Sequence, residues 1–111
     1  MLIFFNDRKL ERAFASPKEL TRAYGAEQAK CLVLRISQIR EARCLADLRT
    51  IPSLRAHELT ADRRGQISLT LRQPYRLIIL AAHHPAPKKP DGGLDWDQVT
   101  EVVIVEVVNY H

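Results

Sequence analysis

The pattern of hydrophobic and polar positions divides the chain into a helical first half and a strand-rich second half. Over about residues 6–52 the apolar residues recur at three- and four-residue spacing, which predicts amphipathic helices. Over about residues 54–111 they alternate with polar residues or form short runs, which predicts β-strands. The apolar run Leu2–Phe5 predicts one further strand. We therefore expect a single two-layer α+β domain over residues 1–111, with helices packed on one face of a mainly antiparallel sheet.

Capping residues predict where the helices begin. Asn6 or Asp7 can cap the first helix, and Ser16 followed by Pro17 is typical of a second helix start. The longest helix is expected at about residues 26–42, where an apolar stripe would bury one side. Its solvent side is expected to carry the polar residues Glu27, Lys30, Arg35, Gln38 and Glu41.

Alternation and turn residues predict the strands of the second half. The expected strands are Arg55–Leu59, Gln66–Arg72, Tyr75–Ala81 and Val99–Asn109. In the second of these strands the apolar side chains should face the helices. Its polar side chains should face solvent, and they are Gln66, Ser68, Thr70 and Arg72. About residues 83–98 are rich in proline, glycine, lysine and aspartate, and we expect them to form a long exposed loop.

The chain is basic, with 17 lysines and arginines against 13 acidic residues. The excess lies in residues 1–82, whereas acidic residues outnumber basic ones from residue 83 onward. This distribution favours a polyanionic partner for the first part of the chain, although an ordinary domain with a high pI has the same composition. Two isolated cysteines, the lack of a signal-peptide pattern and the lack of a membrane-spanning run predict a cytoplasmic protein that binds no membrane.

Two histidines and several arginines are candidates for phosphodiester chemistry. Cleavage of RNA requires one group to deprotonate the ribose 2′-hydroxyl, another to protonate the leaving 5′-oxygen, and cations to stabilise the charge on phosphorus. His57 and His111 are the candidate acid and base. Arg76 is a candidate phosphate ligand, together with Arg63 or Arg64. Such a site requires neither a metal ion nor a cofactor.

Other residues extend this candidate site. Arg55 shares a strand face with the first histidine, and Arg72 lies on the polar face of the next strand. Tyr110 can stack on a base or donate a hydrogen bond to phosphate. Arg76 lies among apolar neighbours, so it either pairs with a carboxylate such as Glu106 or faces a ligand. The alternative is an ordinary surface with a histidine, a solvated arginine turn and a frayed end.

Three segments of the sequence resemble the HigB toxins of the RelE/ParE superfamily. Leu54–Gln66 is similar to the family pattern L-x-x-H-x-L-x-x-D-R-x-G, Tyr75–Ile78 to N-W-R-I, and Val108–His111 to an ending in D-Y-H. The resemblance covers about residues 54–82 and 100–111. The chain departs from the family pattern at Asn109 in place of aspartate, Ile67 in place of an aromatic residue, Thr60 in place of lysine and Pro74-Tyr75 in place of N-W.

The resemblance implies a RelE/ParE-like fold and a toxin that inhibits translation as a ribosome-dependent mRNA endonuclease. It implies a helix-turn-helix antitoxin of the HigA type that neutralises the toxin, with the ribosome and mRNA as further partners. No cofactor is implied. The catalytic residues that it implies are His57, Arg76, Asn109, Tyr110 and His111.

Three alternatives remain open. A ParE-like member would bind a protein target such as gyrase without cutting RNA, and a degenerate member would bind its antitoxin but be inactive. A metal site is the third alternative. It would be formed by His83, His84, Asp91, Asp95 and Asp97. The proline and glycine content of that loop offers no rigid scaffold for ligands, so we expect no metal there.

Overall fold

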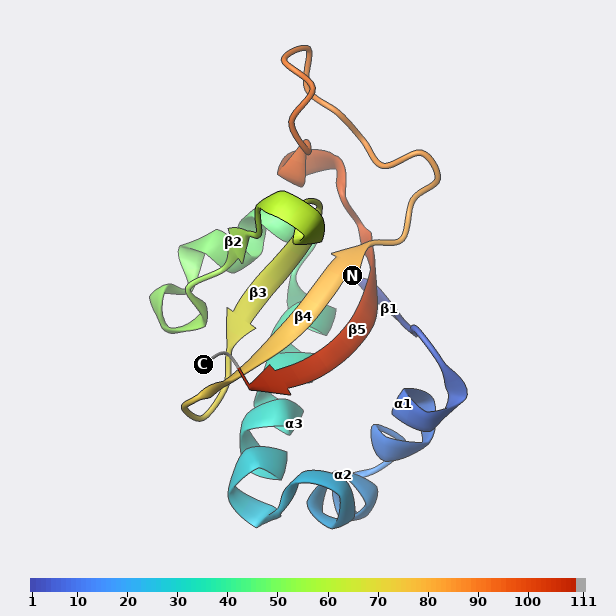
Figure 1. Cartoon of the computed structure of the whole chain (residues 1–111), viewed down its shortest axis with the longest axis vertical. Coiled ribbons are helices and arrows are strands. Elements are labelled where there is room, and N and C mark those ends of the chain that lie inside the picture. The colour runs from blue at the N-terminus through green and yellow to red at the C-terminus, as the bar shows by residue number, and fades with distance from the viewer. Residues whose placement is uncertain (110–111) are drawn as a thin grey trace.

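The computed structural model describes residues 1–109, in which a five-stranded mixed sheet carries helices on one face (Figure 1). The strands are β1 (Leu2–Phe5), β2 (His57–Glu58), β3 (Gln66–Thr70), β4 (Tyr75–Ala81) and β5 (Glu101–Asn109). Their order across the sheet is β1-β5-β4-β3-β2. β1 runs parallel to β5, and the other neighbouring pairs are antiparallel. The predicted α+β class is confirmed.

The helices begin where the capping residues predict. They are α1 (Arg8–Ala13), α2 (Pro17–Tyr24) and α3 (Ala26–Glu41), and the short 3₁₀ turns are η1 (Leu45–Thr50), η2 (Pro52–Leu54), η3 (Ala61–Arg63) and η4 (Trp96–Gln98). The side chain of Asp7 accepts a hydrogen bond from Leu10 N, and that of Ser16 from Glu19 N. Gly25, with φ of +86°, supplies the left-handed turn between α2 and α3. No helix within residues 1–109 is long and apolar enough to cross a membrane.

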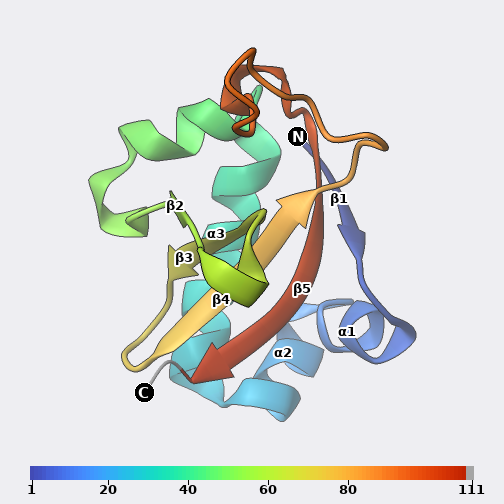
Figure 2. The same cartoon turned by 45° about the horizontal axis from the view of Figure 1, so that its top comes forward.

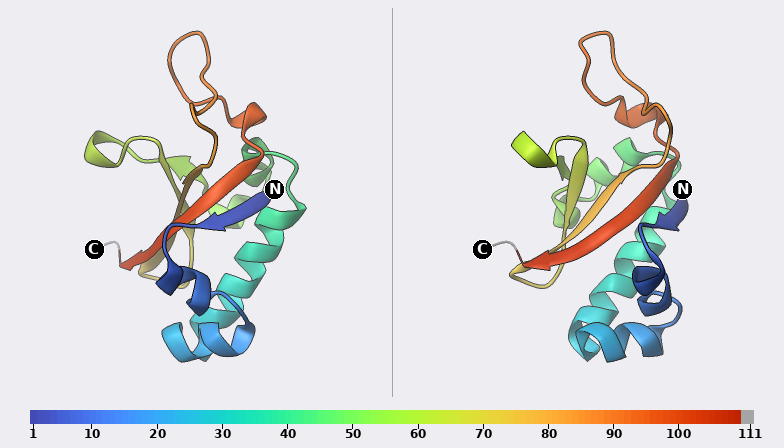
Figure 3. Two further views of the ribbon diagram at one scale, coloured as in Figure 1. Left: turned by 90° about the vertical axis from the view of Figure 1, so that its right-hand side faces the viewer. Right: turned by 45° about the vertical axis from the view of Figure 1, so that its right-hand side comes forward.

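The hydrophobic core lies between α3 and one face of the sheet. Its fully buried members include Leu32 and Ile39 of α3 and Leu69, Leu77 and Ile104 of the sheet. Figure 3 shows α3 on this side and the segment around η3 on the other. We call the sheet face away from α3 the open face; it carries Ser68, Thr70, Arg76, Ile78 and Glu106.

Two polar residues of α3 hold the turn between β3 and β4. Arg35 was predicted to face solvent, and this is wrong: the residue is only 7% exposed, and its Nε donates to Thr70 O at 2.7 Å. The physical reason is that β2 pairs only with residues 67–68 of β3, so Arg35 supplies a donor to a carbonyl beyond the end of β2. Gln28 bonds both the N–H and the carbonyl of Arg72 through its side-chain amide. β3 ends at Thr70, so the prediction that Arg72 extends its polar face is also wrong.

The segment 83–98 is not the wholly exposed loop that its composition predicts. Leu94 and Trp96 are only 6% and 5% exposed and belong to the core. The guanidinium of Arg49 covers the ring of Trp96 at 3.5 Å. The large apolar area of these two side chains ties the end of the loop to the domain.

Candidate functional site

A β-bulge in β5 determines which side chains reach the open face. Ile79 of β4 pairs with Ile104, whereas the preceding Ile78 pairs with Glu106, so Val105 is an extra residue. Strict alternation from Ile104 would put Glu106 on the helix side of the sheet. The bulge instead turns Glu106 to the open face.

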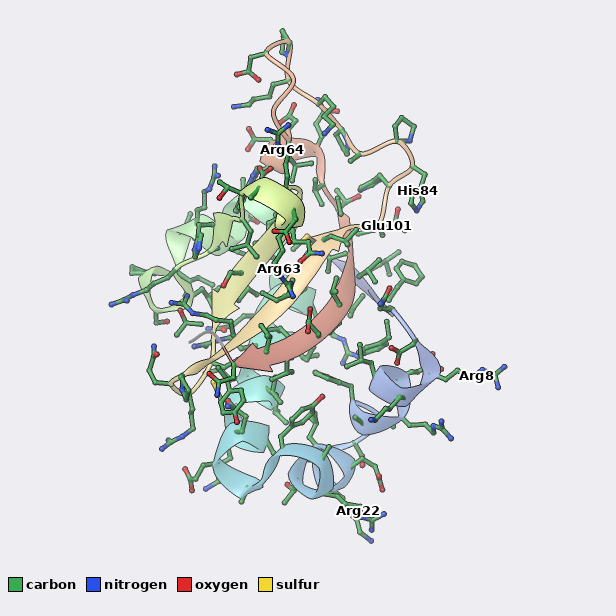
Figure 4. The ribbon with its side chains drawn as sticks, viewed as in Figure 1. Arg8, Arg22, Arg63, Arg64, His84 and Glu101 are labelled. Carbon is green, nitrogen blue, oxygen red and sulfur yellow. The ribbon has the colours of Figure 1, made fainter. Side chains whose placement is uncertain are left out.

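Arg63 lies across the middle of the open face, as Figure 4 shows. Its Nη1 donates to Gln66 Oε1 and its Nη2 to Glu106 Oε2, both at 2.7 Å. Because Gln66 belongs to β3 and Glu106 to β5, the guanidinium bridges the two strands over β4. Ile78 of β4 is fully buried although it lies on this face.

Ser68, next to Ile78 in the sheet register, is 1% exposed, so the expectation that it faces solvent is wrong. In the sheet register Ser68 lies between His57 of β2 and Ile78 of β4, so it has a neighbouring strand on each side. The Ser68 Oγ has no hydrogen-bond partner within the described part of the chain. A buried hydroxyl without a hydrogen-bond partner lowers the free energy of unfolding. The open face therefore contains an unsatisfied polar group, whereas the core on the other face is built from apolar side chains.

The ring of His57 is oriented by the backbone just before it. Arg55 has a φ of +46°, so the strand expected to begin there begins only at His57, and β2 is two residues long. The Arg55 carbonyl lies 2.9 Å from His57 Nδ1. A carbonyl only accepts, so Nδ1 carries a proton, and Nε2 has a free lone pair in the neutral ring. His57 is exposed, opposite Ser68 at the edge of the open face.

Arg76 points across the open face towards β3. Its Nη1 donates to Thr70 Oγ1, the residue directly opposite, at 3.4 Å. Within residues 1–109 no carboxylate forms a salt bridge with Arg76, and its suggested partner Glu106 pairs with Arg63 instead. His57 and Arg76 lie on either side of β3, with α-carbons about 12 Å apart as estimated from strand spacing and rise. One phosphate group above Thr70 is therefore within reach of both side chains.

The other predicted residues are placed differently. Arg64 is exposed beside the long loop, and Arg55 is exposed ahead of β2. Arg72 lies in the β3–β4 turn, 3.6 Å from a carboxylate oxygen of Glu27, so it does not join the open face. Asn109 pairs with Tyr75, and this register puts it on the sheet face opposite to Arg76. The remaining two candidates, Tyr110 and His111, lie outside the described residues.

Sequence reasoning missed the residues that position the site. Thr70 holds Arg76, and Arg35 and Gln28 hold the turn that joins β3 to β4. The alternation of polar residues in β3 places Thr70 on the correct face, but no sequence signal indicates that Arg35 or Gln28 is buried.

The described residues offer no cluster for a metal ion. Within residues 1–109 no group of three or more histidine, cysteine, aspartate or glutamate side chains could hold one. His83, one of the residues considered for such a site, accepts a hydrogen bond from Thr100 N through Nε2. Its Nδ1 lies 3.7 Å from Glu101.

Comparisons with models of known protein families, with curated proteins and with solved structures find no match for this chain. An imidazole with a free Nε2 and a guanidinium without a carboxylate partner among the described residues, on one face of the sheet, can together bind a phosphodiester and move a proton beside it.

Proposed function

We propose that the protein is a HigB-type toxin of the RelE/ParE superfamily, a metal-independent endoribonuclease that cleaves mRNA on the ribosome. The observation that carries the proposal is the approach of His57 and Arg76 from two strands to one face. Two of the segments that resemble HigB supply them: Leu54–Gln66 contains β2 and η3, and Tyr75–Ile78 begins β4. Helices on the other face of the sheet agree with the RelE/ParE-like fold that we propose.

The geometry supports cleavage by internal transfer. The ribose 2′-oxygen attacks phosphorus, the bond to the 5′-oxygen breaks, and the products carry a 2′,3′-cyclic phosphate and a 5′-hydroxyl. His57 Nε2 can accept the proton of the 2′-hydroxyl or, when protonated, donate one to the 5′-oxygen. Arg76, held by Thr70, donates to the non-bridging oxygens as their charge increases. From the resemblance alone, we assign the second proton transfer to His111 and supporting catalytic roles to Asn109 and Tyr110.

The proposed partners follow from the same assignment. A helix-turn-helix antitoxin of the HigA type would neutralise the toxin in the cytoplasm, and the ribosome would present the mRNA. Exposed cations around the site, Arg55 and Arg64 among them, would contact the RNA backbone.

A second candidate is a member of the superfamily that binds without cutting. Two observations favour it: Asn109 lies on the face opposite to Arg76, and Arg63 is held by Glu106. Such a protein would keep a surface that binds RNA, the antitoxin or a protein target. It would lack the complete set of groups that transfer protons during cleavage.

The deciding experiment is induced expression in a bacterium without the antitoxin, followed by mapping of new mRNA ends. We compare the wild type with His57→Ala, Arg76→Ala and His111→Ala. The matched control is His84→Ala, since His84 is an exposed histidine in the long loop, away from the open face (Figure 4). We expect cuts inside translated codons that disappear in the three site variants and persist in the control.

The other outcomes separate the candidates. Growth arrest with intact mRNA would overturn the endonuclease assignment in favour of a binding toxin. Neither arrest nor cuts, with a folded and soluble protein, would identify a degenerate member. Cuts that persist in His57→Ala would show that the open face is not the catalytic site.

A further inference from the structure

A cleft of about 550 Å³ lies where the long loop meets the sheet. In Figure 2 the loop stands at the end of the sheet to which β4 points. Its apolar lining residues are Leu80, Ala81, Ala86 and Leu94. Charged and polar groups stand around it, from Glu58, Arg64, Gln66, Lys88 and Asp91. The volume is in the range of small-molecule sites.

The charges around this cleft are not balanced internally. Asp91 lies 3.9 Å from Lys89, which partly neutralises it. Arg64, Lys88 and Glu58 form no ion pair within residues 1–109, and Glu58 is partly buried. Two cations without an ion-pair partner attract an anion. The cleft therefore presents two cations, one hydrogen-bond acceptor and several apolar side chains.

We propose that this cleft is a subsite for a single nucleotide of an RNA strand. Arg64 and Lys88 bind its phosphate, the base packs against the apolar lining residues, and Glu58 accepts a hydrogen bond from an exocyclic amino group. Adenine, cytosine and guanine carry such a group and uracil does not, so the subsite selects against uracil.

This inference rests on the proposed function in one respect, namely that the nucleotide belongs to the mRNA that the toxin cleaves. Gln66 at the cleft and Thr70 beside Arg76 are four residues apart on β3, about 13 Å by strand rise. An RNA strand held at Arg76 would thus place a flanking nucleotide in the cleft. The binding chemistry of the cleft itself can be tested without RNA cleavage.

Amide NMR of the complete chain gives a direct test with AMP, CMP, GMP and UMP as the probes. The chain has four glycines, whose amide signals are easy to recognise. Gly65, Gly92 and Gly93 line the cleft, whereas Gly25 lies between α2 and α3 and serves as the internal control. We expect the three cleft glycines to shift at millimolar nucleotide while Gly25 stays in place, with UMP about tenfold weaker than CMP.

Substitutions of the cleft residues test their proposed roles in binding the phosphate and the base. Glu58→Gln should reduce the preference for CMP over UMP, because an amide both accepts and donates. Arg64→Ala and Lys88→Ala should weaken all four nucleotides but leave binding of the uncharged nucleosides unchanged. Lys30→Ala, an exposed lysine on α3, is the matched control and should change nothing.

The possible outcomes distinguish a failure of the nucleotide subsite from a failure of the proposed endonuclease function. Cleft glycines that do not respond to any nucleotide, with mRNA still cut in cells, would overturn the subsite alone. Nucleotide binding without any mRNA cleavage would support the subsite and overturn the endonuclease. Cleft signals that move only with an arginine-containing peptide would overturn the nucleotide assignment, since Glu58 would then bind a protein partner.

Discussion

Replacement of Glu106 by glutamine should lower the stability of the protein and strengthen its binding to RNA. Arg63 and Glu106 are 32% and 40% exposed and form a single close contact at 2.7 Å. A partly exposed pair of this kind contributes about 1 kcal/mol to the free energy of unfolding. That loss corresponds to a decrease in melting temperature of about 4 °C for a domain of this length.

The same substitution removes a carboxylate from among the cations of the open face, and it weakens the hold on Arg63. A phosphate on this face then meets about 1 kcal/mol less repulsion, which is about fivefold in affinity. Without the negative charge of Glu106, we expect Arg63 to contact one further phosphate, which steepens the slope of log affinity against log salt by about 0.7.

The assay is fluorescence anisotropy with a 2′-O-methyl RNA oligonucleotide, which cannot be cut, at several salt concentrations. Glu101→Gln is the matched control: it makes the same charge change on the same strand, at the end remote from Arg63. Equal gains in affinity for the two variants would show an effect of net charge only. Weaker RNA binding by Glu106→Gln would refute the reasoning.

Three further predictions concern stability. Arg35→Met removes the charged group that donates to Thr70 O, so the free energy of unfolding in urea should fall by about 2 kcal/mol. Arg40 is exposed, and the control Arg40→Met should change it by less than about 0.5 kcal/mol. Ser68→Ala removes a buried hydroxyl without a described partner and should leave the free energy of unfolding unchanged or raise it by up to about 1 kcal/mol. A clear loss of stability would show that the hydroxyl does have a hydrogen-bond partner. Burial, and secondarily the charge of Asp7, raises the pKa of Tyr24. The stability that the neutral Tyr24 hydroxyl contributes is therefore complete below the pKa that it has in the unfolded chain, and it is lost as pH rises through the pKa of the folded protein. Tyr24→Phe should therefore make the free energy of unfolding fall less steeply with pH in the alkaline range.

Local signals predicted the elements and the starts of the helices, but not the ends of several strands. The caps at Asp7 and Ser16 are interactions within one helical turn, so the sequence contains all of their information. The strands that begin at Gln66 and Tyr75 were found for a similar reason, since alternation or an apolar run is visible in a few residues. The buried Arg35 was missed because its burial depends on how far β2 extends along β3, which is a contact between distant segments.

The sequence by itself determined the α+β class, the positions of the helices, the basic character of the chain and the residue types that suggest RNA chemistry. The tertiary structure alone decided which of these residues meet. One extra residue at Val105 inverts the alternation of β5, so Glu106 turns to the open face to bind Arg63, and Asn109 faces away from Arg76. Strand register and a bulge depend on pairing between segments far apart in the chain, and the two-residue period makes a shift of one residue reverse every side chain.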